Sequence, residues 1–443
     1  MLRKTFILLF VLSFTLTGVA QESWSLQRCI EHARQNNLNL KQAEIAISQA
    51  ELAEKGSRMA RLPNLNASTN FGFQYGRNID PTTNDFINTR LGFNNWSLNA
   101  NLIVFNGGSI NNSIKQSQYD LVAAKEDANN QFQNITLQMA SSYLNVLLAK
   151  EQVTIAQKAL DQTQEQLTQI DKRIEAGTVP KVDRLDILAQ IARNEQTLIQ
   201  AQNSVEINYL TLKNLLELEP DYDLVIDIPA SFLTVDESAA VYSLNTVYAE
   251  ALKSQAIIKA SESRIKSAEL SVPLARADAL PRVVLFGGLD TRFSSVTNFP
   301  SDPYFDQIDR NFGQSFGAQI NIPIYNNHRT SINVQNARLG IINAEVQNRQ
   351  AKQQLKADVQ NAIANARASK IELEASERSF EAAKAAYDNA EKRYNLGAIN
   401  TLELTTAKTN LDTAELNVAR AKYDFIFRAK IIDFYLGKSL SLE

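Results

Sequence analysis

Few residues in this sequence carry a thiol or an imidazole, the side chains best suited to bind transition metals. The 443 residues include one cysteine, Cys29, and two histidines, His32 and His328. A single thiol excludes an internal disulfide, and one cysteine with two histidines is too few for a thiolate or imidazole metal cluster. We therefore interpret Cys29 as a small buried residue and expect no metal site and no cofactor.

The acidic and hydroxyl residues form no catalytic pattern either. No nucleophile stands at a recognisable spacing from a base, and no phosphate-binding loop is present. A hydrolase hypothesis could rest only on acidic residues such as Asp221, Asp223 and Asp227 in the stretch 219–243. That stretch is better interpreted as a linker. We therefore expect that the protein is not an enzyme.

The charge balance argues against a polyanionic partner. Lys and Arg number 45 and Asp and Glu number 48, which gives a net charge of -3. Such a chain has no broad positive field that would attract nucleic acid. We expect no nucleic-acid binding.

The first 20 residues have the pattern of a secretory signal peptide. Arg3 and Lys4 precede an apolar stretch from 5 to 19, and a small residue, Ala20, follows it. The apolar core is shorter than the ~20 residues that a membrane-spanning helix requires. Residues 1–20 are therefore predicted to be cleaved, and Cys29 lies too far beyond the apolar core to predict a lipoprotein.

The remaining chain contains an internal duplication. Residues 172–183 and 392–403 match at an offset of 220, with a Lys-Arg pair, a glycine (Gly177 or Gly397) and a carboxylate in register. A period this long exceeds the 20 to 50 residues of solenoid repeats, so a whole module has been duplicated. The predicted repeats span 21–218 and 244–443, joined by the linker 219–243.

Each repeat is predicted to contain a long helical hairpin. Residues 109–173 hold no proline or glycine and place apolar residues at helical spacing. Residues 328–394 repeat this pattern, with Gly340 as the only helix breaker. A helix of about 65 residues would reach roughly 100 Å. Second helices are predicted at about 180–217 and 400–436, so the hairpins turn at Gly177 and Gly397.

Each repeat also carries two segments of alternating polar and apolar residues. They are predicted as β-strands at about 64–75, 95–105, 282–293 and 312–324. Ten residues suffice for a tilted strand to cross a bilayer, although an ordinary sheet with one buried face shows the same alternation. The polar stretches 76–92 and 294–311 are interpreted as external loops. Four strands cannot close a membrane barrel, so strands that cross the membrane require an oligomer.

Two classes of protein agree with these elements. The leading hypothesis is a passive membrane channel. The alternative is a soluble periplasmic helical scaffold or adaptor, in which the alternating segments form a small sheet. An adaptor would ordinarily have one hairpin flanked by β-domains, whereas this chain has two hairpins and two strand pairs.

The order of several motifs resembles the TolC-like outer-membrane factor family. The motifs are the opening helix 26–33, Asn36-Asn37, Leu62-Pro63, the strand exit 105–108, and the Arg-x-x-x-Gly turns at Arg173 and Arg393. The resemblance implies a mostly α fold with some β, in which long helical hairpins form a periplasmic α-barrel. It also implies a homotrimer, placed in outer-membrane lipid, with one twelve-stranded transmembrane β-barrel built from four strands per chain.

The resemblance further implies a partner assembly and a role for the hairpin turns. Family members receive substrates from an inner-membrane pump through a periplasmic adaptor protein, which docks near the glycine-containing turns. The corresponding residues here are Gly177, Thr178, Val179, Gly397, Ala398 and Ile399. Residues expected to line the tunnel are Asn, Gln, Ser and scattered charges, which favour no one cargo among drugs, metal ions and polypeptides.

The family also implies a gate. Its members narrow the tunnel with carboxylates six and nine residues after the second glycine, which here are Glu403 and Thr406. The same offsets in the first repeat give Asp183 and Asp186, and threefold symmetry would make each a ring of charges. The family suggests that Tyr394 helps to hold the gate, although a helix-surface tyrosine that simply packs on its neighbour is at least an equal alternative. Glu403 could equally serve a capping box with Asn400.

Overall fold

The computed structural model describes residues 23–79, 84–227, 242–297 and 301–438, and it divides into two compact units. The hairpin unit comprises residues up to 41, 132–251 and from 358 onward, and the strand unit comprises 42–131 and 252–357. The predicted signal peptide, 1–20, and most of the predicted linker, 219–243, lie outside the described residues.

Long helices dominate the described chain, as the sequence predicted. The two longest, α3 and α8, have 67 residues each and extend through both units. Within the described residues, no helix combines the length and apolar character required to cross a bilayer. The helices are α1 (Leu26–Asn36), α2 (Leu38–Met59), α3 (Ser109–Glu175), α4 (Asp183–Leu215), α5 (Leu244–Ser254), α6 (Ala256–Ala277), α7 (Tyr304–Arg310), α8 (Arg329–Asn395) and α9 (Thr401–Tyr435).

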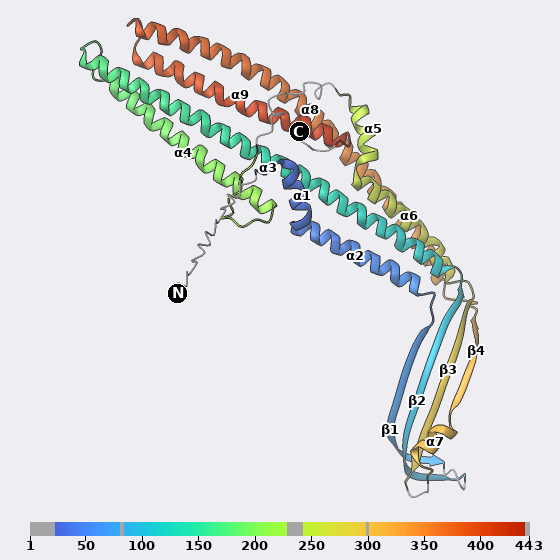
Figure 1. The fold of residues 1–443 in the computed structure, drawn as a ribbon. Coiled ribbons are helices and arrows are strands. Elements are labelled where there is room, and N and C mark those ends of the chain that lie inside the picture. The colour runs from blue at the N-terminus through green and yellow to red at the C-terminus, as the bar shows by residue number, and fades with distance from the viewer. Residues whose placement is uncertain (1–22, 80–83, 228–241, 298–300, 439–443) are drawn as a thin grey trace, which may run out of the picture. The chain divides into compact units, whose positions relative to one another are not determined.

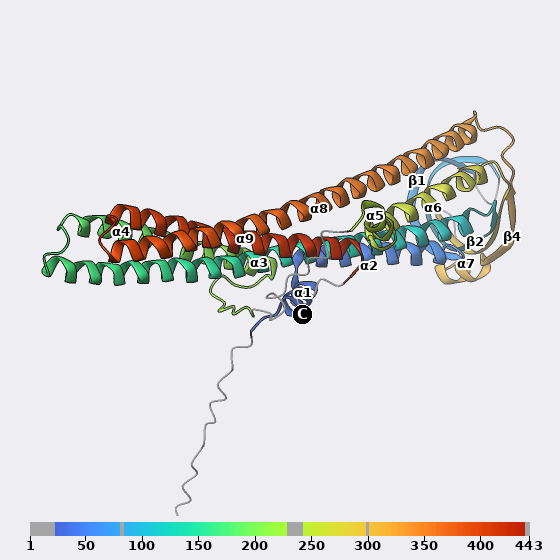
Figure 2. The same ribbon diagram turned by 90° about the horizontal axis from the view of Figure 1, so that it is seen from above.

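The hairpin unit contains two helical hairpins that lie side by side, α3 with α4 and α8 with α9 (Figures 1 and 2). Small and apolar side chains join α3 to α4, including Ala156 and Leu198, while Leu373 on α8 packs with Phe425 on α9. Small residues allow neighbouring helices to approach closely. The hairpins are therefore held along much of their length by ordinary apolar packing.

The largest core of the hairpin unit surrounds Tyr143 on α3. The Tyr143 hydroxyl lies 3.0 Å from the carbonyl oxygen of Trp24 and 2.5 Å from that of Asp227. Cys29 is fully buried in this core, and burial raises the pKa of its thiol to about 12. The prediction that Cys29 is a buried residue is confirmed. The core ties the N-terminal segment to the middle of the chain.

The strand unit contains one antiparallel sheet in the order β1-β2-β3-β4. Its register places Asn64 opposite Asn101, Asn66 opposite Asn99 and Ser68 opposite Ser97, so polar residues gather on one face. The opposite face is apolar and aromatic, because side chains alternate along each strand. We call these the polar face and the apolar face. The strands are β1 (Asn64–Ile79), β2 (Phe86–Asn106), β3 (Arg282–Val296) and β4 (Gly313–Asn321).

The strands and the loops between them differ in part from the sequence prediction. β2 begins at Phe86 rather than near 95, so much of the expected loop 76–92 is strand. Its first residues reverse the pattern, since Arg90 lies on the apolar face and Phe93 on the polar face. β4 ends at Asn321 rather than near 324, because Pro323 has no N–H to donate to a ladder. The expected loop 294–311 contains the short helix α7.

Candidate functional site

The two hairpin turns have the same backbone geometry. Gly177 and Gly397 have φ angles of +70° and +71°, a region that favours glycine. The N–H of Gly177 donates to Ile174 and that of Thr178 to Arg173, at 3.0 and 2.9 Å. The second turn repeats both bonds 220 residues later, at 3.0 and 2.8 Å. Each long helix therefore ends in a Schellman motif.

The return helices begin differently after these turns. Asn400 caps α9, because its side-chain oxygen accepts a hydrogen bond from the N–H of Glu403 at 2.9 Å. α4 begins at Asp183 after Val182, whose side chain provides no such cap. The capping interpretation at Asn400 is thus observed directly. Acidic residues in both first turns also complement the helix dipole.

The turn regions of the two hairpins contact each other. Arg173, at the end of α3, donates to the amide oxygen of Asn395 at 2.7 Å, and its guanidinium lies 5.0 Å from the centre of the Tyr394 ring. The Tyr394 hydroxyl lies 3.3 Å from the hydroxyl of Thr401. Tyr394 is buried in an apolar cluster with Ile187 from the other hairpin. Tyr394 therefore belongs to the contact between the hairpins, not to a free helix surface.

The predicted gate carboxylates are not joined to one another in this structure. Asp186 and Glu403 are exposed and Asp183 is half-buried. Within the described chain, none of the three side chains takes part in an ion pair. The residues predicted to meet an adaptor, Gly177, Thr178, Gly397 and Ala398, are also exposed, while Val179 and Ile399 are half-buried. The turns thus present accessible backbone and carboxylates.

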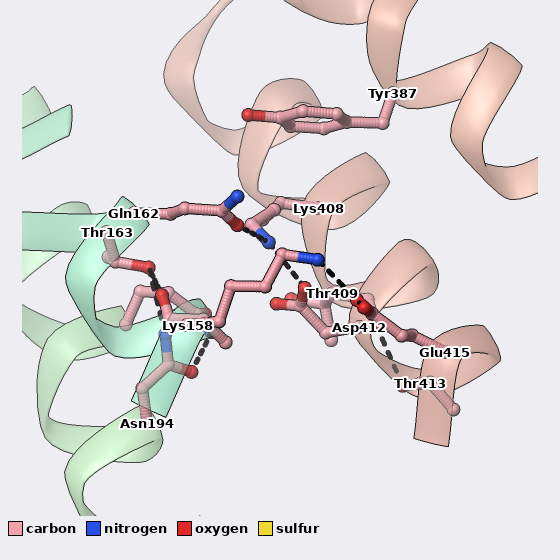
Figure 3. Close-up of polar contacts among 12 residues, drawn as sticks. Lys158, Gln162, Thr163, Asn194, Tyr387, Lys408, Thr409, Asp412, Thr413 and Glu415 are labelled. Carbon is pink, nitrogen blue, oxygen red and sulfur yellow. Dashed lines mark hydrogen bonds and ion pairs between the residues drawn. The ribbon is translucent and has the colours of Figure 1, made fainter. Parts of the chain in front are cut away.

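A buried polar cluster lies farther along the hairpins, and the sequence reasoning missed it (Figure 3). Its centre is Lys408 on α9, which is only 3% exposed. The Lys408 ammonium donates to Gln162 on α3 at 2.6 Å and to Asp412 one turn along α9. It also lies 5.7 Å from the ring of Tyr387 on α8. One lysine therefore links three helices of the two hairpins.

Burial controls the ionisation of this cluster. The pKa of Asp412 is raised because its carboxylate loses hydration, although the hydrogen bond and charge of Lys408 oppose that rise. Burial likewise raises the pKa of Tyr387, whose hydroxyl accepts a hydrogen bond from Gln166 at 3.1 Å. A buried ion pair is sensitive to loss of one partner, because the remaining charge lacks both water and a counter-charge.

A second set of polar side chains extends from the cluster into α4. Asn194 donates to the hydroxyl of Thr163 at 2.9 Å and to the Ala159 carbonyl at 3.2 Å, and it accepts from Gln190. A cavity of about 210 Å³ lies beside them and is lined also by Asp412. The signal for this region was present in the sequence, since Thr401, Leu404, Thr405, Lys408 and Asp412 follow one stripe of α9.

The described residues contain no group of three or more His, Cys, Asp and Glu side chains placed to hold a metal ion. What they do contain is a pair of duplicated hairpins with accessible turns and a four-stranded sheet with an apolar face. Comparisons with known proteins identify the family to which a chain with these elements belongs.

The sequence model of the family described as "Outer membrane efflux protein" matches residues 29–217 and 247–437. Outer membrane efflux protein BepC of Brucella suis is 23% identical over 415 residues, which cover 93% of this chain and 85% of that protein. Outer membrane protein TolC of Vibrio cholerae is 23% identical over 428 residues, covering 96% and 93%.

A crystal structure of CusC has a similar fold, with a TM-score of 0.78 at 19% identity over 94% of this chain and 92% of that one. TolC-like channels are trimeric and work with an adaptor and an inner-membrane pump. The family match covers both repeats and leaves the soluble-adaptor alternative without support. The chain therefore belongs to the outer membrane efflux protein family, and it is an outer-membrane exit channel with a periplasmic helical tunnel, not an enzyme.

Proposed function

We propose that this chain works as a homotrimer, in which the sheets of three copies join into one twelve-stranded barrel. The observation that carries the proposal is the open sheet: β1 and β4 each have an unpaired edge, while Phe71 and Phe316 on the apolar face are 82% and 92% exposed. Unpaired backbone groups are costly in lipid, so the edges require partners. Pairing β1 of one copy with β4 of the next supplies them.

The helices offer a second surface for the same assembly. Leu185, Ile199 and Ile207 on α4 are large apolar residues that are 62%, 64% and 55% exposed within one chain. Their spacing of 14 and 8 residues keeps them near one side of a helix. A neighbouring copy that packs against α4 would bury this stripe and help to close the tunnel.

The mass of the purified protein tests the trimer. Native mass spectrometry in detergent should give three chains per particle, and an unheated gel should show a species that heating converts to monomer. The Ile199→Glu variant should weaken the trimer, whereas Ile371→Glu on the exposed surface of α8 provides a comparison at an apolar residue that is 64% exposed. A monomeric wild-type protein would contradict the proposal.

We place the gate at the hairpin turns. Asp183, Asp186 and Glu403 would form charged rings in a trimer, and the turn residues Gly177, Thr178, Val179, Gly397, Ala398 and Ile399 would meet hairpins of a periplasmic adaptor, which passes cargo from an inner-membrane pump. The accessible carboxylates support this role, and a ring of negative charge binds cations. The contact of Arg173 with Tyr394 and Asn395 would hold the turns together when the gate is shut.

Single-channel recordings test the charged rings. Multivalent cations added on the periplasmic side should block the wild-type channel. The Asp183→Asn, Asp186→Asn and Glu403→Gln variants should each reduce this block, because each removes three charges from a trimer. The Asp306→Asn variant, which removes an exposed carboxylate from α7 in the strand unit, serves as a control. If multivalent cations blocked all three turn variants as they block the wild type, these residues would not form the gate.

A further inference from the structure

The charged residues of the four strands are divided between the two faces of the sheet. Arg282, Asp290 and Arg292 lie on the polar face, because they pair in register with Asn106, Ser97 and Asn95. Only Arg77 and Arg90 lie on the apolar face, in register with Asn88 and Tyr75. Strands β1 and β2 contain no acidic residue. The apolar face therefore carries two cations and no charge to balance them.

The two arginines are held in a diagonal row with two aromatic rings. The Arg90 guanidinium lies 3.9 Å from the centre of the Phe73 ring, and the Arg77 guanidinium lies 4.2 Å from that of Phe86. Gly92 provides room for Phe73, since a Cβ atom there would lie 3.3 Å from the ring. Stacking orients a guanidinium while leaving its N–H edge available.

The guanidinium N–H groups of Arg77 and Arg90 donate no hydrogen bond within the described chain. Neither guanidinium forms a hydrogen bond or an ion pair with a described residue. Arg77 and Arg90 are diagonal neighbours on one face, a relationship that separates Cβ atoms by roughly 7 Å. Two long side chains at that separation can reach one ligand together.

The distance along the strands places the arginines at the edge of the hydrocarbon layer. Arg77 follows Asn64 by 13 residues along β1, and Arg90 stands opposite Tyr75, which follows by 11. At ~3.3 Å per residue and a tilt of about 40°, these positions are roughly 28 to 33 Å from the helix end of the sheet. The apolar band of a membrane barrel is about 25 Å tall, and a charge beyond it costs little.

Because the helices lie in the periplasm, the end of the sheet that carries Arg77 and Arg90 reaches the outer leaflet. We propose that Arg77 and Arg90 bind the phosphate groups of an anionic lipid in that leaflet. A guanidinium fork matches phosphate geometry and forms two charge-assisted hydrogen bonds. Phe73, Tyr75 and Phe86 would contact the adjoining acyl chains. The proposal rests on the outer-membrane location and goes beyond the efflux function.

Binding of defined lipids to the purified full-length protein tests the site. Native mass spectrometry would compare lipid A carrying its phosphates with the same lipid after both phosphates are removed. The wild-type protein should bind the phosphorylated lipid more tightly. Each basic residue near an anionic surface contributes about fivefold in affinity, so the Arg77→Gln/Arg90→Gln variant should bind roughly 25-fold more weakly.

The Arg292→Gln variant is the matched control, because it removes an exposed arginine from the polar face of the same sheet. It should bind the phosphorylated lipid as the wild type does. Equal losses in the control and the double variant, or no loss in the double variant, would overturn the proposal. So would a double variant that loses only its oligomeric state, which would assign the arginines to a contact between copies. Wild-type protein that fails to insert into vesicles would instead contradict the channel itself.

Discussion

The two return helices, α4 and α9, begin after nearly identical turns and yet are stabilised differently. At an offset of 220, Lys408 and Asp412 on α9 correspond to Leu188 and Ala192 on α4. Lys408 is buried against α3 and α8, whereas Leu188 is half-buried and Ala192 is exposed. Both repeats have the glycine turn, which backbone geometry dictates, whereas α9 has a buried charged pair at positions where α4 has Leu188 and Ala192. We therefore expect substitutions at Lys408 and Asp412 in the second repeat to lower the free energy of unfolding more than substitutions at the corresponding residues of the first.

The largest expected effect is the loss of Lys408. The Lys408→Leu variant leaves Asp412 buried without its cation, and breaking such a pair costs about 3–5 kcal/mol. Urea denaturation of the full chain in detergent would measure the free energy of unfolding. Lys158→Leu is the control, because Lys158 pairs with Glu415 while 55% exposed and should cost below about 1 kcal/mol. If both variants lost the same free energy of unfolding, burial would not explain the contribution of Lys408.

Acidification should relieve part of that loss. Without the hydrogen bond and charge of Lys408, only the charge of Lys158 still opposes the burial that raises the Asp412 pKa above its unfolded value. The folded variant then binds a proton more tightly than the unfolded chain, so its stability is highest at low pH and falls as pH rises through the raised pKa. The difference between wild type and Lys408→Leu should therefore be smaller at pH 5 than at pH 7. A difference independent of pH would exclude Asp412 as its source.

The next variant converts the second repeat to the residue types of the first. Lys408→Leu/Asp412→Ala removes both charges together, and replacing a buried ion pair by apolar side chains is often neutral. Stability should return to within about 1 kcal/mol of the wild type. A double variant as unstable as Lys408→Leu alone would indicate that Gln162 or Tyr387, and not Asp412, makes the lysine necessary.

The same comparison shows what a sequence can predict. The turns at Gly177 and Gly397 follow from a local signal, glycine where φ is positive. The long helices follow from about 65 residues at helical spacing, with no helix breaker in the first and only Gly340 in the second. Lys408 was missed because a lysine by type indicates a solvated surface, and only the packing of α3 and α8 around α9 buries it. β2 was placed too late because the reversed polarity at Arg90 hides the alternation.

A smaller effect is expected from the contact between the turns. The Arg173→Ala variant removes a hydrogen bond to Asn395 and the cation–π contact with Tyr394, each worth about 1 kcal/mol. If these contacts hold the turns together, single-channel recordings should show more frequent opening, and the free energy of unfolding should fall by at most about 2 kcal/mol. Lys172→Ala, a neighbouring exposed lysine, is the control. Unchanged gating in Arg173→Ala would leave the apolar cluster around Ile187 and Leu404 as the structure that holds the turns.

The smallest effect concerns the cap, where the two return helices differ most locally. Asn400→Ala removes the acceptor for the Glu403 N–H and should cost about 1 kcal/mol. Val182→Ala at the start of α4 should change the free energy of unfolding by less than about 0.5 kcal/mol, because the Val182 side chain forms no capping hydrogen bond. The Glu403→Gln variant separates capping from charge, since it retains the Asn400 cap while removing the carboxylate from the proposed charged ring. Asn400→Ala removes the cap and leaves the Glu403 charge in place. If it changed cation block as strongly as Glu403→Gln, the block would depend on the structure of the first turn of α9 and not on the charge of Glu403.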